Sequence, residues 1–294
     1  MFPPIPTPFD DHDQLDRAAL RFNVERWMRT PLAGIVVLGS NGESALVDED
    51  ESRAAIETTR EAVPSDRLLI AGTGRESTRA TIRASKEAAK AGADVVLVRT
   101  PSFFKSEMTH DAFVRHYRAV ADASPVPVLL YNFQRVTGVN LAPATVAELA
   151  QHPNIVGIKE SGGDMAQVSD LVSLTPSDFQ VLVGAAPTLY TSLCVGATGG
   201  IVAAACVIPE LCVKIYDLTR AGHHAEALAM QRQIVPIARA VTTGFGVPGL
   251  KAALNLSGYR AGLPRPPLQP ASSGALETLR QQLAALAQPA ASRA

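Results

Sequence analysis

The sequence predicts an α/β fold, a (β/α)8 TIM barrel followed by a C-terminal helical domain. Short apolar segments recur at a regular spacing, and longer segments of helical character separate them. This alternation implies parallel βαβ units, and eight such units close a barrel. After Ala204 the strand-like segments cease, which marks the beginning of the C-terminal addition. A doubly wound open sheet uses the same alternation and is the main alternative.

Eight segments have the composition of buried strands. They are short and apolar, as expected where both faces of a parallel sheet are covered. In sequence order, the predicted strands are Phe2–Pro6, Gly34–Leu38, Leu68–Ala71, Val95–Val98, Val128–Tyr131, Val156–Lys159, Val181–Gly184 and Gly200–Ala203.

The longer segments between these strands are predicted to form helices. Ser77 precedes an Ala- and Lys-rich run and is typical of a helix start, and Gly92 follows that run as a stop. In sequence order, the predicted helices are Ala18–Met28, Glu49–Ala62, Ser77–Ala91, Asp111–Asp122, Pro143–Gln151 and Met165–Ser173.

The C-terminal part of the chain is predicted to be helical. From about Pro209 onward, apolar residues recur with the helical period and no convincing strand follows. Glycine and proline indicate one loop at Gly244–Gly249 and another at Leu263–Pro267. We therefore expect a barrel over residues 1–225 and a helical domain over residues 226–294, with residues 289–294 frayed.

The composition excludes several classes of partner. Lys and Arg total 27 while Asp and Glu total 28, so no excess of positive charge is available to bind nucleic acid or a membrane surface. The N-terminus lacks the pattern of a signal peptide, and no long uninterrupted apolar stretch occurs. Cys194, Cys206 and Cys212 lie in apolar stretches, which is typical of buried reduced thiols. We expect a soluble, cytoplasmic protein.

No metal or cofactor site is predicted. The chain has no Walker A sequence, and its Gly72–Ser77 segment lacks the third glycine of a dinucleotide-binding loop. The histidines do not show metal-ligand spacing with a carboxylate, so solvated or hydrogen-bonded histidines are expected instead. These residues are His12, His110, His116, His152, His223 and His224.

Lys159 is the most informative residue for function. It ends a predicted strand, and catalytic groups of a barrel come from the C-terminal ends of its strands. A buried lysine without a partner favours the neutral amine, which can attack a carbonyl and form a Schiff base. The alternative is a lysine whose ammonium extends to solvent.

Tyr131 and the turn at Ser40–Gly42 lie at the ends of two other strands. A phenol beside an amine or imine can transfer protons as a general acid and base, although a half-buried structural tyrosine is the commoner case. The turn offers a hydroxyl, an amide and backbone N–H groups, which suit a carboxylate. A helix cap without a ligand is the alternative for this turn.

Several motifs together resemble the dihydrodipicolinate synthase and N-acetylneuraminate lyase superfamily. Gly39–Glu43 is similar to its Gly-x-x-Gly-Glu motif, Tyr131–Gly138 to its Tyr-Asn…Thr-Gly segment, and Gly157–Ser161 to its Schiff-base strand. Val183–Gly200 and Gly258–Leu268 also fit, so the resemblance covers nearly the whole chain.

The resemblance implies a class I lyase that needs no cofactor and assembles as a homotetramer. By analogy, Lys159 forms a Schiff base with the keto group of a small 2-oxo acid, Tyr131 transfers protons and Ser40 orients the reacting oxygen. The substrate-binding positions that match the family are Ser40, Asn41, Ser161 and Gly184.

Two positions differ from the dihydrodipicolinate synthases of this superfamily. Those enzymes have an arginine for the second substrate where this chain has Val136, and tyrosines of a proton relay where it has Phe103 and Phe104. Arg135 is adjacent, but neighbouring side chains of an extended segment point in opposite directions. The chain is more similar to the 4-hydroxy-2-oxoglutarate aldolase branch in four segments, which are Ser40–Asn41, Gln151–Gly157, Ser161–Asp164 and Phe245–Lys251. That branch also has tyrosines where this chain has Phe103 and Phe104.

The leading hypothesis is therefore cleavage of 4-hydroxy-2-oxoglutarate to pyruvate and glyoxylate. The alternatives keep the same lysine and are a dihydrodipicolinate synthase-type condensation or the dehydration of a sugar-derived 2-keto-3-deoxy acid. A third hypothesis is a sensor that binds a 2-oxo acid without turnover.

Overall fold

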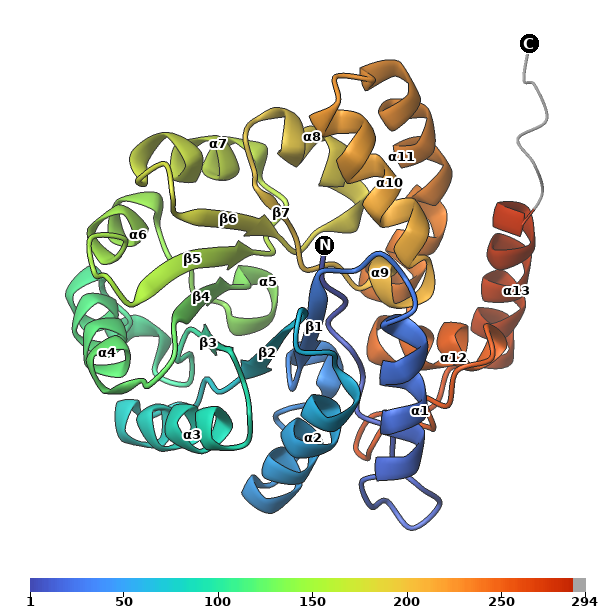
Figure 1. Ribbon diagram of the computed structural model, residues 1–294, viewed down its shortest axis with the longest axis horizontal. Helices are drawn as coiled ribbons and strands as arrows, with labels where there is room; N and C mark the ends of the chain where they lie inside the picture. Colours follow the sequence, from blue (N-terminus) through green and yellow to red (C-terminus); the bar gives the residue numbers. More distant parts are fainter. Residues whose placement is uncertain (288–294) are drawn as a thin grey trace.

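Seven parallel strands form one curled sheet in sequence order (Figure 1). The computed structural model describes residues 1–287, so residues 288–294, including the end expected to fray, lie outside the described residues. The α/β class with a parallel sheet is confirmed. The strands are β1 (Gly34–Val37), β2 (Leu68–Gly72), β3 (Val95–Arg99), β4 (Val128–Asn132), β5 (Ile155–Glu160), β6 (Gln180–Val183) and β7 (Gly199–Gly200).

The N-terminal segment joins the two edges of this sheet. Phe2 forms a parallel bridge with Ile201 beyond β7, and Pro4 forms one with Val36 of β1. The prediction of a regular strand at Phe2–Pro6 is wrong, because the prolines in this segment have no N–H to donate to a ladder. The predicted strand at Gly200–Ala203 is also too long, since β7 ends at Gly200.

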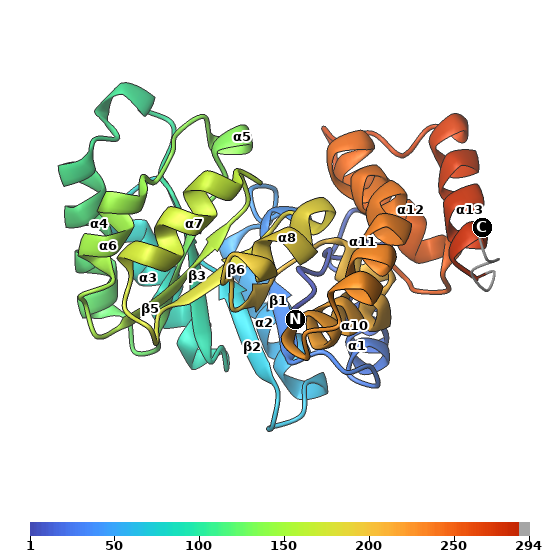
Figure 2. The same ribbon diagram turned by 90° about the horizontal axis from the view of Figure 1, so that it is seen from above.

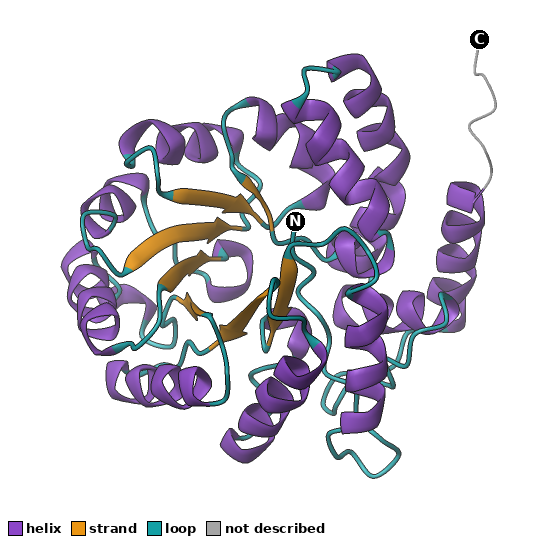
Figure 3. Cartoon of the chain, in the orientation of Figure 1, coloured by secondary structure: helices purple, strands orange, loops and turns teal. Residues whose placement is uncertain are grey.

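Helices surround the strands on the outside (Figure 3). Each predicted helix between strands is found, and Ser77 caps its helix by accepting a hydrogen bond from the Ala80 N–H at 3.1 Å. The short helix α5 (Gln134–Thr137) lies between β4 and the next long helix. The other helices of this part are α1 (Arg17–Trp27), α2 (Glu49–Ala62), α3 (Thr78–Lys90), α4 (His110–Ala123), α6 (Pro143–Leu149), α7 (Met165–Leu174) and α8 (Leu189–Cys194).

The chain after β7 is helical, as expected, and its last helices gather on one side of the sheet (Figure 2). The loop predicted at Gly244–Gly249 is wrong, because a helix begins at Gly246 and Pro248 falls in its first turn, where a missing N–H costs little. The helices are α9 (Ala204–Val207), α10 (Pro209–Arg220), α11 (His224–Arg239), α12 (Gly246–Leu256) and α13 (Ser273–Ala287).

Helix α1 connects the C-terminal segment to the rest of the protein. The Trp27 ring stacks on Tyr259 with centroids 4.9 Å apart. The Asn23 side chain donates to the Arg260 carbonyl at 2.8 Å and accepts from the Arg260 N–H at 2.8 Å. These contacts hold the segment that carries Arg265 against the barrel. The division at residues 225 and 226 stays a prediction.

Apolar side chains form two clusters that explain which strand positions face inward. The larger lies between the sheet and the helices, and the smaller lies inside the barrel. Leu97, Leu129 and Tyr131 belong to the inner cluster. Because side chains alternate along a strand, Arg99 and Lys159 share that inward face. The inner cluster also contains Val36, Ile70, Leu182 and Ile201.

The cysteines differ in their surroundings. Cys206 and Cys212 are buried free thiols, as expected, and burial raises the pKa of the Cys212 thiol to about 12. Cys194 is exposed, contrary to the prediction, because it lies at the end of the short helix α8. Within residues 1–287, no helix is long and apolar enough to cross a membrane.

Candidate active site

Lys159 and Tyr131 are paired across two neighbouring strands. In the register of β4 and β5, Tyr131 lies opposite Lys159. The Lys159 Nζ lies 4.3 Å from the centroid of the Tyr131 ring. Each residue is only 4% exposed, so the Lys159 ammonium does not extend to solvent. Among the described residues, no carboxylate forms an ion pair with this amine, and the electron-rich face of the phenol ring is its neighbour.

Ser40 joins this pair from the end of β1. It begins a short 3-10 turn, Ser40–Gly42, and its Oγ lies 3.2 Å from the Tyr131 hydroxyl, a hydrogen bond in which either oxygen can donate. The three residues expected to carry chemistry therefore meet at one end of the barrel. Asn41 lies in the same turn, but its side chain forms no hydrogen bond within residues 1–287.

Ser161 and Gly184 lie next to each other at the ends of β5 and β6. The Ser161 N–H donates to the Asn132 carbonyl at 3.0 Å, and the Gly184 N–H donates to the Glu160 carbonyl at 2.7 Å. A Cβ on Gly184 would lie 1.9 Å from the Ser161 Oγ, so only glycine allows this approach. Gly184 follows β6, which pairs with β5 on the side away from β4 and Tyr131.

A buried polar network lies directly behind Tyr131 and Lys159. Asn132 and Glu160 follow Tyr131 and Lys159 in their strands and so point outward from the barrel. The Asn132 Nδ2 donates to the Glu160 Oε2 at 2.7 Å, and the Gln167 side chain donates to the same oxygen at 2.9 Å. The outer pair therefore fixes the register in which the inner pair meets.

A second network holds the turn that carries Ser40. Leu38 and Glu43 bracket this turn, and both have a positive φ, 57° and 54°. Such a conformation costs a non-glycine residue about 1–3 kcal/mol and persists only where contacts impose it. Glu43 is buried and forms an ion pair with Lys251 of α12 at 2.6 Å. The Arg265 N–H donates to the Glu43 Oε2 at 2.8 Å.

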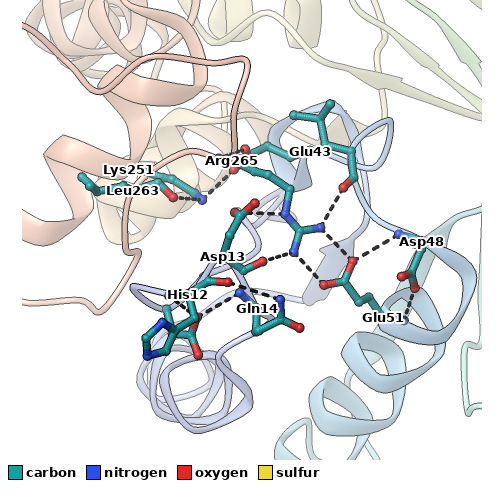
Figure 4. A network of polar contacts seen from close by, with 11 residues as sticks. His12, Asp13, Gln14, Glu43, Asp48, Glu51, Lys251, Leu263 and Arg265 are labelled. Atoms are coloured by element: carbon teal, nitrogen blue, oxygen red, sulfur yellow. Dashed lines mark hydrogen bonds and ion pairs between the residues drawn. The ribbon is translucent and has the colours of Figure 1, made fainter.

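Arg265 extends this network to the N-terminal segment (Figure 4). Its guanidinium lies between Glu51 of α2, at 2.6 and 2.7 Å, and the Asp13 carboxylate, at 3.2 Å. Arg265 holds the pKa of the Glu51 carboxyl below its ordinary value, mainly through this hydrogen bonding. The C-terminal segment thus supports the Ser40 turn through the contacts of Lys251 and Arg265 with Glu43.

We expect Lys251→Met to lower the free energy of unfolding by about 3 kcal/mol, because it leaves the Glu43 carboxylate buried without its cation. Burial, the largest influence, lowers the pKa of Lys251, and Glu43 opposes that effect. Urea denaturation followed by circular dichroism measures the change.

Lys214→Met, on the exposed face of α10, is the matched control and should change stability by less than about 0.5 kcal/mol. The double variant Glu43→Gln/Lys251→Met should recover part of the loss, because it removes both charges together. Equal urea midpoints for Lys251→Met and the unmodified protein would contradict this account of the ion pair.

The positions that differ from the synthases lie on the surface. Phe103 and Phe104 are 78% and 67% exposed, and their rings meet edge to face. Val136 is 64% exposed and lies in helix α5. The sequence analysis took this segment to be extended, which is wrong. Arg135, also exposed, lies with its guanidinium carbon 6.0 Å from the Phe133 ring centroid, so it is directed toward that ring.

Arg99 is the site residue that the sequence analysis missed. The predicted strand ended at Val98, whereas β3 ends at Arg99, opposite Tyr131 in the register of β3 and β4. A charged residue that follows an apolar strand was the available signal. Arg99 lines a cavity together with Ser40 and Tyr131.

Comparisons with known proteins identify the family of the chain. A family model described as the dihydrodipicolinate synthetase family matches residues 1–286. The chain is 36% identical to a 4-hydroxy-tetrahydrodipicolinate synthase of Methanothrix thermoacetophila, over 96% of this chain and 95% of that protein. It is 37% identical to a probable mitochondrial 4-hydroxy-2-oxoglutarate aldolase of Emericella nidulans, over 91% of this chain and 88% of that protein.

A solved structure of the same family has a closely similar fold. It is a prophage protein of E. coli K12 in complex with pyruvate, with a TM-score of 0.91 and 29% identity. The match covers 97% of both chains. The similarity therefore extends over the sheet, the surrounding helices and the C-terminal segment.

Proposed function

This chain belongs to the dihydrodipicolinate synthetase family of lyases, and we propose that it is a class I aldolase that cleaves 4-hydroxy-2-oxoglutarate to pyruvate and glyoxylate. The observation that carries this proposal is the buried Lys159 amine, which has no carboxylate partner among the described residues and lies 4.3 Å from the Tyr131 ring centroid. Such an amine suits Schiff-base formation with a keto group.

The reaction begins when the Lys159 amine adds to the C2 carbonyl and water leaves, which produces a protonated imine. The C4 hydroxyl then gives up its proton, and the C3–C4 bond breaks to release glyoxylate. The electron pair of that bond moves toward the imine nitrogen and leaves an enamine. Protonation at C3 and hydrolysis of the imine release pyruvate and restore the amine.

Tyr131 is proposed to accept and return the protons of these steps. Its hydroxyl lies in the same cavity as Ser40 and forms a hydrogen bond with the Ser40 Oγ at 3.2 Å, which orients it. A phenol held in this way can act as a general base and then as a general acid. We also propose that Ser40, Asn41, Ser161 and Gly184 surround the substrate carboxylate and the imine carbon.

Cleavage is favoured over the condensation performed by synthases because Val136 has no charge to hold a second substrate. Phe103 and Phe104 do not separate the two reactions, because the aldolase branch also has tyrosines at these positions. The condensation remains the second candidate, because the chain is also 36% identical to a protein named 4-hydroxy-tetrahydrodipicolinate synthase.

A panel of substrates tests the proposal. We expect rapid release of pyruvate and glyoxylate from 4-hydroxy-2-oxoglutarate, measured by coupling pyruvate to lactate dehydrogenase. Sugar-derived 2-keto-3-deoxy acids should show neither loss of water nor comparable pyruvate release. Pyruvate with aspartate semialdehyde tests the condensation. Consumption of both these compounds without cleavage of 4-hydroxy-2-oxoglutarate would overturn the proposal in favour of a synthase, and saturable binding without any product would indicate a sensor.

Two further expectations concern the architecture. We propose that the protein is a homotetramer, supported by the exposed apolar side chains of Phe103, Phe104 and Val136 near the barrel rim. We also propose that residues 226–294 form a helical domain. Its role would be to support the Ser40 turn through Lys251 and Arg265.

A further inference from the structure

Arg99 places a positive charge at the end of the barrel where Lys159 lies. It ends β3, and its neighbour in register is Tyr131, whose own neighbour in β5 is Lys159. Adjacent strands are about 4.8 Å apart, so the backbones at Arg99 and Lys159 are roughly 10 Å apart, and both side chains belong to the inward face. Arg99 and Lys159 therefore lie on either side of Tyr131 at the same end of the barrel.

Two glycines at and just after the end of the neighbouring strand β2 leave room beside Arg99. Gly72 and Gly74 line the same cavity as Arg99, Ser40 and Tyr131. A Cβ on Gly74 would lie 2.6 Å from the Arg99 Cγ, so the arginine stem occupies the room that this glycine leaves. The other described residues that line this cavity are uncharged, and they include Leu38, Gly39, Ser44 and Leu97. Arg99 therefore supplies the charge in this cavity.

The guanidinium of Arg99 is held on one side only. Its Nη1 donates to the Glu76 Oε1 at 2.7 Å and to the Thr100 carbonyl at 3.1 Å. Glu76 is fixed in turn, because its Oε2 accepts from the Ser102 and Phe103 N–H groups at 2.8 and 2.9 Å. Within residues 1–287 the Nε and Nη2 of Arg99 donate no hydrogen bond, which leaves donors for a ligand.

We propose that Arg99 binds the second carboxylate of the substrate, so that the site selects dicarboxylic 2-oxo acids. This inference deepens the proposed function and rests on it. The guanidinium presents paired N–H donors that match a carboxylate, and Glu76 orients it beforehand. Arg99 thus binds the second carboxylate, for which Val136 has no charged group.

Binding of two matched ligands tests the proposal without any turnover. 2-Oxoglutarate and 2-oxopentanoate are five-carbon 2-oxo acids that differ in a terminal carboxylate or methyl group. Titration calorimetry should give the unmodified protein a Kd for 2-oxoglutarate at least about tenfold lower than for 2-oxopentanoate, as expected for a charge-assisted pair. In Arg99→Gln this preference should disappear while the Kd of 2-oxopentanoate changes less than about twofold.

Arg135→Gln is the matched control, because Arg135 is an exposed arginine of the nearby helix α5, and it should keep the preference. Arg99→Lys keeps the positive charge near Glu76, so it should still bind 2-oxoglutarate more tightly than 2-oxopentanoate, but by a smaller factor. If Arg99→Gln weakens the binding of both ligands by the same factor, Arg99 only supports the loop at Ser102 and Phe103 through Glu76, and the proposal is overturned. Equal binding of both ligands by the unmodified protein would also overturn it.

The outcome is separable from that of the proposed function. Borohydride reduction in the presence of pyruvate reports Schiff-base formation and needs no second carboxylate. An adduct with pyruvate but no preference for 2-oxoglutarate would contradict the role of Arg99 and leave the Schiff-base function supported. A preference that Arg99→Gln removes, without any pyruvate adduct, would instead support the anion site and contradict the Schiff-base function.

Discussion

Lys159→Ala is expected to lower kcat by at least about 10⁴-fold, because removal of the nucleophile leaves only binding and orientation to assist the reaction. The amine is buried at the end of β5, and its Nζ lies 4.3 Å from the centroid of the Tyr131 ring. Borohydride reduction with pyruvate, followed by mass spectrometry, should locate the adduct at Lys159 in the unmodified protein and find none in the variant.

Lys159→Arg and Lys86→Ala are the controls for this result. The arginine retains a positive charge in the barrel but cannot form the imine, so it should be as inactive as the alanine variant. Lys86 is exposed on α3, and its loss should leave both the adduct and kcat unchanged. An adduct of equal yield in Lys159→Ala would show that another amine reacts and would refute the assignment.

Tyr131→Phe is expected to lower kcat by about 10²–10³-fold with little change in KM, because general acid–base groups contribute rate of this order. The phenylalanine keeps the ring that lies beside Lys159 and stacks on Phe133, with centroids 6.0 Å apart, so the packing is preserved. Only the hydroxyl that meets Ser40 is lost. Steady-state kinetics with 4-hydroxy-2-oxoglutarate measures both parameters.

Tyr216→Phe removes a hydroxyl from α10 and should retain full activity. The borohydride adduct with pyruvate separates chemistry from structural damage, because Tyr131→Phe should still form it, only more slowly. A kcat within about twofold of the unmodified value would exclude the Tyr131 hydroxyl as the proton carrier.

The position of Lys159 near the end of a buried strand was predictable because it depends on local patterns. The apolar strand that ends in Lys159 is visible in the sequence, and the parallel barrel places all such strand ends on one face. Tyr131 follows from the same rule, and the 3.2 Å contact of its hydroxyl with Ser40 agrees with it. The missed Arg99 shows the limit of this rule, since a strand boundary that is wrong by one residue hides a charged side chain.

Other features depended on which segments meet in space. The N-terminal segment contains three prolines and forms only isolated bridges, yet it joins the two edges of the sheet. The Gly-Pro-rich stretch at Gly244–Gly249 was expected to be a loop, but the first turn of a helix accommodates Pro248 without loss of a hydrogen bond. Local composition is ambiguous in both cases, and packing decides the outcome.

The sequence by itself determined the alternation of parallel strands and helices from β1 onward, the positions of Lys159 and Tyr131 at strand ends, and the resemblance that led to the family. Tertiary structure decided how the site is held. Glu43 and Arg265 are 222 residues apart and meet only when the C-terminal segment packs against the barrel. Asn132 and Glu160 likewise pair only after β4 and β5 adopt their register. Periodicity and burial are local properties that a sequence displays, whereas a charged or polar side chain acquires its partner from the packing of distant segments.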